Sequence, residues 1–398
     1  MDSTLKAATR GLGRYARSRV RNAHARRSAP ERVAERPYRA KLELTYHCNL
    51  RCGFCYTDSP RRTLERTAEL DDEAWRRIVG QSLELGIGEA VITGGEPLLR
   101  RELALESIER VEAAGVDRIV LNTNGWFVDD GVADRLARAR KLEVHVSIDG
   151  PTPELHDAAR GVPGSWRRAV GAVDLLLARD AHVRVLHVIT PQNQHALPEY
   201  LDAMWSLGVR RLSLAAVVPV GAAARSRGWS VNRLRMYRQV RSFVERTHGE
   251  VAVALENGIA GRLTTRNHTP RSFMIRPNGA FLADSNHPFS FGDAGAQPLA
   301  ECWEALREGW MDERVRRWIE RVPRNRRIPE MELVPYRDDE VAIVGPNEIM
   351  RGRPAAVQTE RALEVLAEKS PPPPADGVGD IDAARAHVEQ LVLARAER

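Results

Sequence analysis

The chain has 398 residues, of which 43% are hydrophobic and 29% charged, and its formal net charge is +6. A chain of this length allows one large domain with a smaller companion and can bury a substantial core. The composition excludes a disordered chain, a collagen-like repeat and a small disulfide-stapled domain. The positive charge is uneven: residues 1–40 contain eleven Lys or Arg and three Asp or Glu, so the excess basicity lies in an N-terminal arm.

The N-terminal sequence is charged throughout, which is not typical of a secretory signal. The longest uncharged apolar run, residues 212–224, is too short to span a bilayer and contains Pro219 and Gly221. We therefore expect a soluble, cytoplasmic protein with no membrane span. The basic arm is expected to be a mobile solvated segment, with an acidic peptide, a nucleic acid or a membrane surface as alternative partners. Its only aromatic residues are Tyr15 and Tyr38, and for this reason no nucleic acid is expected.

From Lys41 onward, short apolar strands alternate with longer helical patterns, which predicts βα units and a parallel sheet. Strands are expected over residues 41–46, 89–93, 118–122, 143–148, 182–189 and 211–218, and helices over 72–86, 101–115, 131–140, 165–179, 196–207 and 230–247. Six units are too few for a closed eight-stranded barrel. The predicted fold class is therefore α/β, a partial (β/α)6 TIM barrel.

Beyond residue 250 the pattern changes to that of a small α+β extension. A hairpin is expected over 272–290, with its turn at Pro277-Asn278-Gly279, followed by a helix over 298–320. A Pro-rich linker (371–374) precedes a final helix over 381–398. The predicted organisation is a basic arm (1–40), a core (41–250), an extension (251–345) and a tail (346–398).

Three of the four cysteines lie within eight residues after the first predicted strand: Cys48, Cys52 and Cys55, with the spacing C-x3-C-x2-C. In a reducing compartment such clustering indicates a metal site rather than disulfides. Three thiolates on one loop can hold three irons of a cubane cluster and leave its fourth iron free. A structural zinc site normally has four protein ligands. Here the fourth would be His47, badly placed beside Cys48, or the distant Cys302.

Further motifs follow the later strands. They are Thr93-Gly94-Gly95-Glu96-Pro97 after the second strand, Asn122-Thr123-Asn124-Gly125 after the third, Ser147-Ile148-Asp149-Gly150 after the fourth, and His156-Asp157 with Arg160-Gly161 beyond it. The motifs fall at the carboxyl ends of predicted strands, where barrel folds build their sites. Together with the cysteines, they resemble the radical S-adenosylmethionine (radical SAM) superfamily over roughly residues 41–250.

The resemblance implies a [4Fe-4S] cluster on the three cysteines, with its free iron chelated by the amino and carboxylate groups of S-adenosylmethionine (SAM). It also implies the SAM contacts: Gly94, Gly95, Glu96 and Pro97 for the ammonium, Arg160 for the carboxylate, Ser147 or Asp149 for the ribose, Phe54, Val188 and Ile189 for the adenine, and Asn124 in the same site. The implied activity is reductive cleavage of SAM to a 5′-deoxyadenosyl radical, which abstracts hydrogen from a substrate. An electron donor such as flavodoxin or ferredoxin is the expected partner.

Residues 272–310 resemble the SPASM or twitch extension of peptide-maturing radical SAM enzymes. The matching residues are Pro277, Gly279, Gly292, Asp293, Leu299 and Trp303. The cluster cysteines of that extension are missing, and Asp284 stands where the first is expected. We therefore predict its shape without an auxiliary cluster. The remaining thiol, Cys302, is predicted to be a small buried apolar residue, with a hydrogen-atom donor to a substrate radical as the alternative.

Three functions remain open at this point. The leading hypothesis is a radical SAM enzyme acting on a peptide or protein, like a ribosomal peptide maturase, by oxidation, cross-linking or epimerisation. The second keeps the cofactor and changes the substrate to a small-molecule biosynthetic intermediate, such as a tetrapyrrole or a sugar. The third, from another class, is a non-catalytic iron–sulfur or zinc protein, which would not require the motifs after the second and fourth strands.

Overall fold

The computed structural model describes residues 33–59, 69–217, 221–225, 228–256, 271–283, 289–312 and 315, together with the strand backbones of 342–344 and 349–351. The expected basic arm up to residue 32, Asp284, the Pro-rich linker and the final helix lie outside the described residues. Among the helices that are described, none is long and apolar enough to cross a membrane.

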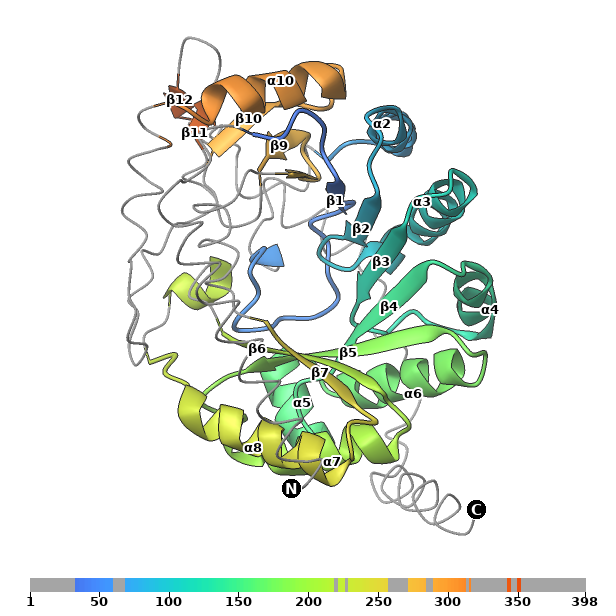
Figure 1. Ribbon diagram of the computed structural model, residues 1–398, viewed down its shortest axis with the longest axis vertical. Helices are drawn as coiled ribbons and strands as arrows, with labels where there is room; N and C mark the ends of the chain where they lie inside the picture. Colours follow the sequence, from blue (N-terminus) through green and yellow to red (C-terminus); the bar gives the residue numbers. More distant parts are fainter. Residues whose placement is uncertain are drawn as a thin grey trace, which may run out of the picture.

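The strands of the described chain form one curved sheet, whose first seven strands are parallel (Figure 1). These seven, neighbours in the sheet as in the sequence, are β1 (Arg39–Glu43), β2 (Glu89–Thr93), β3 (Arg118–Thr123), β4 (Leu142–Ser147), β5 (His182–Ile189), β6 (Arg211–Ala216) and β7 (Ala252–Glu256). On the other side of β1 follow β8 (Ser272–Ile275), parallel to β1, then β9 (Ala280–Leu282), β10 (Phe289–Asp293), β11 (Ala342–Val344) and β12 (Ile349–Arg351).

Helices connect the parallel strands and lie outside the curve of the sheet (Figure 1). The helices are α2 (Asp72–Glu84), α3 (Arg101–Ala113), α4 (Asp130–Arg138), α5 (Pro153–Arg160), α6 (Ser165–Leu177), α7 (Leu197–Ser206), α8 (Arg233–Arg246) and α10 (Leu299–Gly309), with short 3-10 turns η3 (Pro97–Arg100), η4 (Gln194–Ala196) and η5 (Gly221–Arg225). Two of these helices begin at aspartates, because the side chains of Asp71 and Asp129 accept N–H groups of the first turns of α2 and α4.

Successive side chains of a strand point to opposite faces of the sheet, and β4 shows how the two faces differ. On β4, Leu142, Val144 and Val146 belong to the buried core between sheet and helices. The alternate residues Glu143 and His145 point into the interior of the barrel and bind charged partners there. The helix side of the sheet therefore carries the hydrophobic core, and the inner side is left for polar groups.

The six strands predicted from the sequence are confirmed, and so is the hairpin of β8 and β9. Its turn uses Gly279 in the left-handed region (φ +89), where glycine meets least strain. The elements that were not predicted include the strand β7, which pairs in parallel with β6, the short helix α5 and the strand β10. β7 extends the parallel sheet past residue 250, where the predicted core ends. Its sequence is a short apolar run without polar alternation, so the pattern does not distinguish a strand from part of a helix.

Candidate functional site

The loops that follow β1 and β2 lie directly against each other at the carboxyl edge of the sheet. Gly95 donates its N–H to the Thr45 carbonyl (2.6 Å), and Glu96 donates its N–H to the His47 carbonyl (2.8 Å). A Cβ on Gly94 would come within 2.7 Å of the Thr45 carbonyl oxygen, and one on Gly95 would collide with the His47 carbonyl. The two glycines are therefore required for this close approach, which fixes the start of the cysteine loop.

The three clustered cysteines are free thiols, each partly exposed, on the loop that follows β1. The Cys55 N–H binds the Cys52 carbonyl (3.2 Å), so the second and third cysteines share one turn. Burial, followed by repulsion from Cys52 and Glu96, holds the pKa of the Cys48 thiol well above its ordinary value. Burial also raises the pKa of the Cys52 thiol to about 11, against the attraction of Arg160. Thiolates in this loop therefore need a bound cation to be stable.

The donor set fits an iron–sulfur cluster better than a single metal ion. In the described residues, no group of three or more His, Cys, Asp or Glu side chains is arranged to hold one metal ion. A cubane cluster binds each thiolate through a different iron, so its cysteines lie farther apart than those around one zinc ion. Two N–H donors from neighbouring elements also face the sulfurs: Asn124 Nδ2 lies 3.9 Å from Cys48 Sγ, and Arg160 Nη1 lies 3.7 Å from Cys52 Sγ.

The far side of the cysteine loop is fixed inside the barrel. The Tyr56 hydroxyl lies 2.8 Å from Glu43 Oε1, a fully buried carboxylate at the end of β1. The Ala222 N–H, from η5, binds the Cys55 carbonyl at 2.8 Å. The loop is thus held at both ends before any cofactor binds, which lowers the entropic cost of presenting three thiols together.

Glu96, from the Gly-Gly-Glu-Pro motif, is fully buried and accepts three hydrogen bonds. The donors are Asn124 N–H (2.7 Å), the Thr123 hydroxyl (2.8 Å) and Leu98 N–H (3.1 Å). Burial raises the pKa of this carboxyl to about 7, although the hydrogen bonds favour its charged form. Because a carboxylate has about four acceptor positions, one remains for a ligand. Glu96 therefore joins the loops of β2 and β3 in addition to any contact with SAM.

Asn124 links the end of β3 to the cysteine loop. Its Nδ2 donates to Asn49 Oδ1 (2.8 Å), and its Oδ1 accepts the Trp126 N–H (2.9 Å). Asn49 stands between the first two cysteines and was not singled out from the sequence; its only signal is its position inside the motif. The pair aligns the β3 loop beside Cys48.

A buried ion pair closes the site at the ends of β4 and α5. Asp149 is fully buried, and its Oδ2 lies 2.6 Å from Arg160 Nε. Asp149 Oδ1 accepts the Val188 N–H from β5 (2.7 Å). The Arg160 guanidinium stacks 5.6 Å from the Phe54 ring, so it lies between the carboxylate and the cysteine loop. The two residues predicted to contact different parts of SAM are thus bound to each other in this structure.

The other residues of the His-Asp…Arg-Gly motif place α5 rather than face a ligand. His156 Nδ1 accepts the Asp149 N–H (3.0 Å), and burial lowers the pKa of that imidazole to about 3, so the ring is neutral. The Asp157 carboxylate accepts N–H groups from Gly164 (2.6 Å) and Trp166 (2.7 Å), which caps the start of α6. Gly161 ends α5 in the left-handed region, and a Cβ there would lie 2.7 Å from the Arg51 carbonyl.

The remaining predicted site residues divide between the barrel interior and the core. Ser147 and Val188 are partly exposed at the carboxyl ends of β4 and β5, whereas Ile189 is fully buried in the hydrophobic core. Pro97 is buried in the first turn of η3. Asn193, which was not predicted, donates through Nδ2 to the carbonyls of Asp149 (3.0 Å) and Val188 (2.9 Å).

Cys302 lies apart from this edge, on α10 of the extension. Its side chain is fully buried in the hydrophobic core, as the prediction of a small apolar residue requires. Its sulfur touches the backbone at Gly292 so closely that a Cβ there would lie 2.7 Å from it. Burial raises the pKa of this thiol to about 12.

Residues 42–204 match the Radical SAM superfamily. The chain contains a radical SAM domain. This domain spans β1 to α7 and so includes the cysteine loop, Glu96, Asn124, Asp149 and Arg160. The α/β fold with its parallel sheet is the partial barrel that the sequence predicts.

Known proteins similar to this chain have names that refer to different products. A pre-heme d1 synthase of Dinoroseobacter shibae is 32% identical over 203 residues, 51% of this chain and 49% of that protein. The mycofactocin maturase MftC of Mycobacterium tuberculosis is 34% identical over 171 residues, 43% of this chain and 42% of that protein. The chain thus spans about half the length of the curated relatives it matches.

The same fold occurs in a solved structure of Streptococcus suis SuiB bound to the precursor peptide SuiA. The TM-score is 0.60 at 18% identity, over 75% of this chain and 72% of that one. The superposition extends beyond the radical SAM domain, because that domain is 163 of the 398 residues. A fold of this kind therefore continues into part of the C-terminal half.

Proposed function

We propose that this chain is a radical SAM enzyme that binds one [4Fe-4S] cluster through Cys48, Cys52 and Cys55 and modifies a peptide or protein. The observation that carries the proposal is the cysteine loop itself. Its three thiols lie at the carboxyl edge of a radical SAM domain, with Asn124 and Arg160 donating toward two of the sulfurs. When bound, the cluster and SAM supply reductive cleavage of a C–S bond and a 5′-deoxyadenosyl radical.

The residues of the site would position SAM rather than transfer protons. The free acceptor position on Glu96 suits the ammonium of SAM, and Gly94, Gly95 and Pro97 bring that carboxylate to the cluster edge. Ser147 and Val188 line the inner ends of β4 and β5 and suit the ribose and adenine, and Phe54, beside Arg160, would complete the adenine contacts. Ile189 would not contact SAM directly. As a core residue, it would fix the position of the end of β5.

Asp149 and Arg160 would hold SAM as a preformed pair. Arg160 has donors beyond those that face Asp149 and Cys52, because a guanidinium carries five N–H groups. One of these is available for the SAM carboxylate without breaking the pair. Asp149 keeps the guanidinium charged and oriented, so the ribose contact falls to Ser147.

A peptide substrate is supported by the Ser-Ile-Asp-Gly and His-Asp…Arg-Gly motifs, which resemble those of the peptide-modifying branch of the superfamily, and by the hairpin and helix of the extension, β8 to α10. The chain has four cysteines in all, and Cys302 is the only one outside the cluster loop. The extension would therefore present a substrate surface without an auxiliary cluster. A small-molecule substrate is the second candidate, because a pre-heme d1 synthase is about as similar to this chain as a PqqA peptide cyclase is. Flavodoxin or ferredoxin would serve as the electron donor.

The test is anaerobic reconstitution, followed by incubation with SAM, a reductant and candidate substrates. We expect about four irons per chain, 5′-deoxyadenosine as a product and a mass change in a peptide. SAM cleavage that is stimulated by a tetrapyrrole and by no peptide would select the second candidate. A reconstituted protein that holds the cluster and never cleaves SAM would favour the non-catalytic iron–sulfur protein.

A further inference from the structure

A second polar region lies at the opposite end of the barrel from the cysteines. It is a hollow of about 500 Å³ at the amino ends of β3 to β6. Its lining residues are Arg118, Lys141, Leu142, Glu143, His182, Arg184 and Arg211. Arg118, His182 and Arg211 are the first residues of their strands, so the hollow opens at the amino edge of the sheet. None of these residues belongs to the proposed cluster and SAM site.

The hollow carries an excess of positive charge. Its lining includes four cations, Arg118, Lys141, Arg184 and Arg211, and one carboxylate, Glu143, which leaves three positive charges in excess with His182 neutral. A concave surface lined by one sign of charge concentrates counter-ions of the other sign. Any anion of suitable size would therefore be stabilised here.

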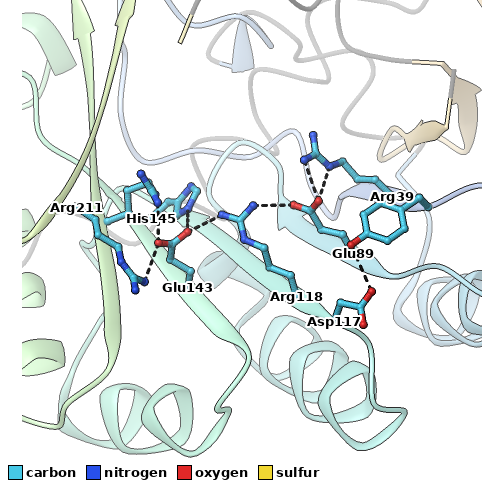
Figure 2. A network of polar contacts seen from close by, with 9 residues as sticks. Arg39, Glu89, Asp117, Arg118, Glu143, His145 and Arg211 are labelled. Carbon is cyan, nitrogen blue, oxygen red and sulfur yellow. Dashed lines mark hydrogen bonds and ion pairs between the residues drawn. The ribbon is translucent and has the colours of Figure 1, made fainter. Parts of the chain in front are cut away.

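Glu143 arranges the guanidinium groups around the hollow (Figure 2). Its Oε1 accepts from Arg184 Nη2 (3.0 Å) and Arg211 Nη1 (3.2 Å), and its Oε2 accepts from Arg118 Nη2 (2.6 Å) and lies 3.0 Å from His145 Nε2. These contacts hold the pKa of the Glu143 carboxyl well below its usual range, despite burial. One oxygen thus holds two arginines side by side.

Arg184 and Arg211 keep most of their donors. Each gives a single N–H to Glu143, and within the described chain neither guanidinium has another protein acceptor. A guanidinium carries five N–H groups in a fork that matches the oxygens of phosphate. The exposed fraction of the Arg211 side chain is 46%, so its free donors are open to solvent.

The part of the same network around Glu89 serves as a comparison, because its charges do no more than close this end of the barrel. Glu89 accepts from Arg39 (2.8 Å) and Arg118 (3.1 Å), so charges alternate along the sheet edge (Figure 2). Charged side chains that only close the end of the barrel need no more than this alternation of carboxylates and arginines. Past Glu143 the alternation stops, and Arg184, Arg211 and Lys141 follow without a second carboxylate in the lining.

We propose that this hollow, which we call the amino-end basin, binds a phosphate group carried by a small organic molecule. Two arginines fixed by one carboxylate suit the tetrahedral, multiply charged oxygens of a phosphate ester, and Lys141 adds a point charge at the rim. The volume is within the range of small-molecule sites and exceeds what inorganic phosphate fills. The proposal does not depend on radical chemistry at the other end of the barrel.

The experiment is calorimetric titration of the full chain with ribose 5-phosphate, pyrophosphate and hexaglutamate, at low and at moderate salt. None of the three contains adenine, so none can make the adenine contacts of a SAM site, and the test variant leaves that site unchanged. The test variant is Arg184→Gln/Arg211→Gln. The control is Arg241→Gln/Arg246→Gln on α8, which removes the same charge from exposed side chains elsewhere.

We expect saturable, salt-sensitive binding of the phosphates, weakened about tenfold or more in the test variant and less than about twofold in the control. Tighter binding of ribose 5-phosphate than of pyrophosphate supports an organic phosphate ester, and the reverse order would overturn the organic carrier. Equal losses in the two variants, no saturable binding, or tighter binding of hexaglutamate would each overturn the proposal.

A second variant guards against loss of the fold. Arg184 is largely buried, so its replacement disturbs Glu143, and thermal unfolding of the double variant is recorded alongside. Lys141→Gln is the milder change, because its ammonium binds only the Gly115 carbonyl (2.9 Å) among described residues. We expect severalfold weaker phosphate binding with an unchanged unfolding temperature. Unchanged binding in this variant would contradict the role assigned to the rim.

Discussion

The two ends of the barrel use charge in opposite ways. At the carboxyl edge the titratable groups are buried and have partners: Asp149 pairs with Arg160, and Glu96 accepts three hydrogen bonds. At the amino edge the carboxylates Glu89 and Glu143 share a larger number of arginines, which remain partly exposed.

Burial explains this difference. A buried charge without a partner costs several kcal/mol, so the carboxyl edge tolerates no excess. An exposed arginine keeps its hydration and costs little when unmatched. Paired charges therefore characterise the carboxyl edge, which shapes a fixed cofactor site. Excess positive charge characterises the amino edge, which is free to attract a ligand from solution.

The largest effect is expected from the cysteine loop. In the triple variant Cys48→Ala, Cys52→Ala, Cys55→Ala, iron binding and SAM cleavage should both be lost, because no other cysteine lies near enough to replace a ligand. The fold should persist, since these side chains are partly exposed and outside the hydrophobic core. Iron analysis, product chromatography and circular dichroism make the measurement. Retained SAM cleavage would show that the cluster is elsewhere.

The comparison of the two edges is tested directly by one arginine from each. Arg160→Ala leaves Asp149 buried without its cation, and we expect a loss of about 3–5 kcal/mol in the free energy of unfolding. Arg211→Ala removes a half-exposed partner from Glu143, which keeps Arg118 and Arg184, and we expect about 1 kcal/mol or less. Chemical denaturation of both variants gives the two values. Equal losses would mean that burial does not separate the edges.

The carboxyl edge should also give the protein a pH dependence, through His156. Burial lowers the pKa of this imidazole to about 3, and its Nδ1 already accepts the Asp149 N–H, so the folded chain resists protonation. The unfolded chain takes up that proton near its ordinary pKa of about 6.5. The stabilisation that the neutral His156 contributes is therefore complete above about pH 6.5 and is lost progressively as the pH falls toward 3.

The measurement is the free energy of unfolding between pH 7 and pH 4, in the parent and in His156→Asn. We expect the parent to lose a few kcal/mol more than the variant over this interval. His195→Asn, on an exposed imidazole in η4, is the matched control and should follow the parent. Parallel curves for the parent and His156→Asn would exclude the histidine as the source.

The sequence predicted the elements whose apolar residues recur at a regular spacing and whose ends are marked by turn or cap residues. It missed elements without these signals. β4 alternates apolar and polar residues between two helical patterns, and it was located to within a residue. β7 is a short apolar run without polar alternation, which does not distinguish a strand from part of a helix, and its pairing partner lies 41 positions earlier in the chain. Such a strand is held by its neighbour more than by its own composition.

For the site, the sequence indicated which residues lie together, but not which of them face a ligand and which hold other residues in place. The motifs correctly placed Asp149 and Arg160 at one edge, yet nothing in them shows that the two bind each other. His156 and Asp157 read like site residues and instead hold α5 and α6 in place. The arginines of the amino-end basin are 27 to 93 residues apart in sequence, so only the parallel register brings them together.

The smallest effect is expected at Cys302, which belongs to neither edge. Cys302→Ala removes one sulfur from a fully buried position on α10, and we expect a loss of about 1 kcal/mol in the free energy of unfolding. A thiol that donated a hydrogen atom to a substrate radical would have to meet the substrate, and this one is enclosed by the core and by the backbone at Gly292. The variant should therefore form the same product as the parent, with the same deuterium content in D2O. A product that loses solvent deuterium in Cys302→Ala would assign the thiol to the reaction and would require the extension to open during turnover.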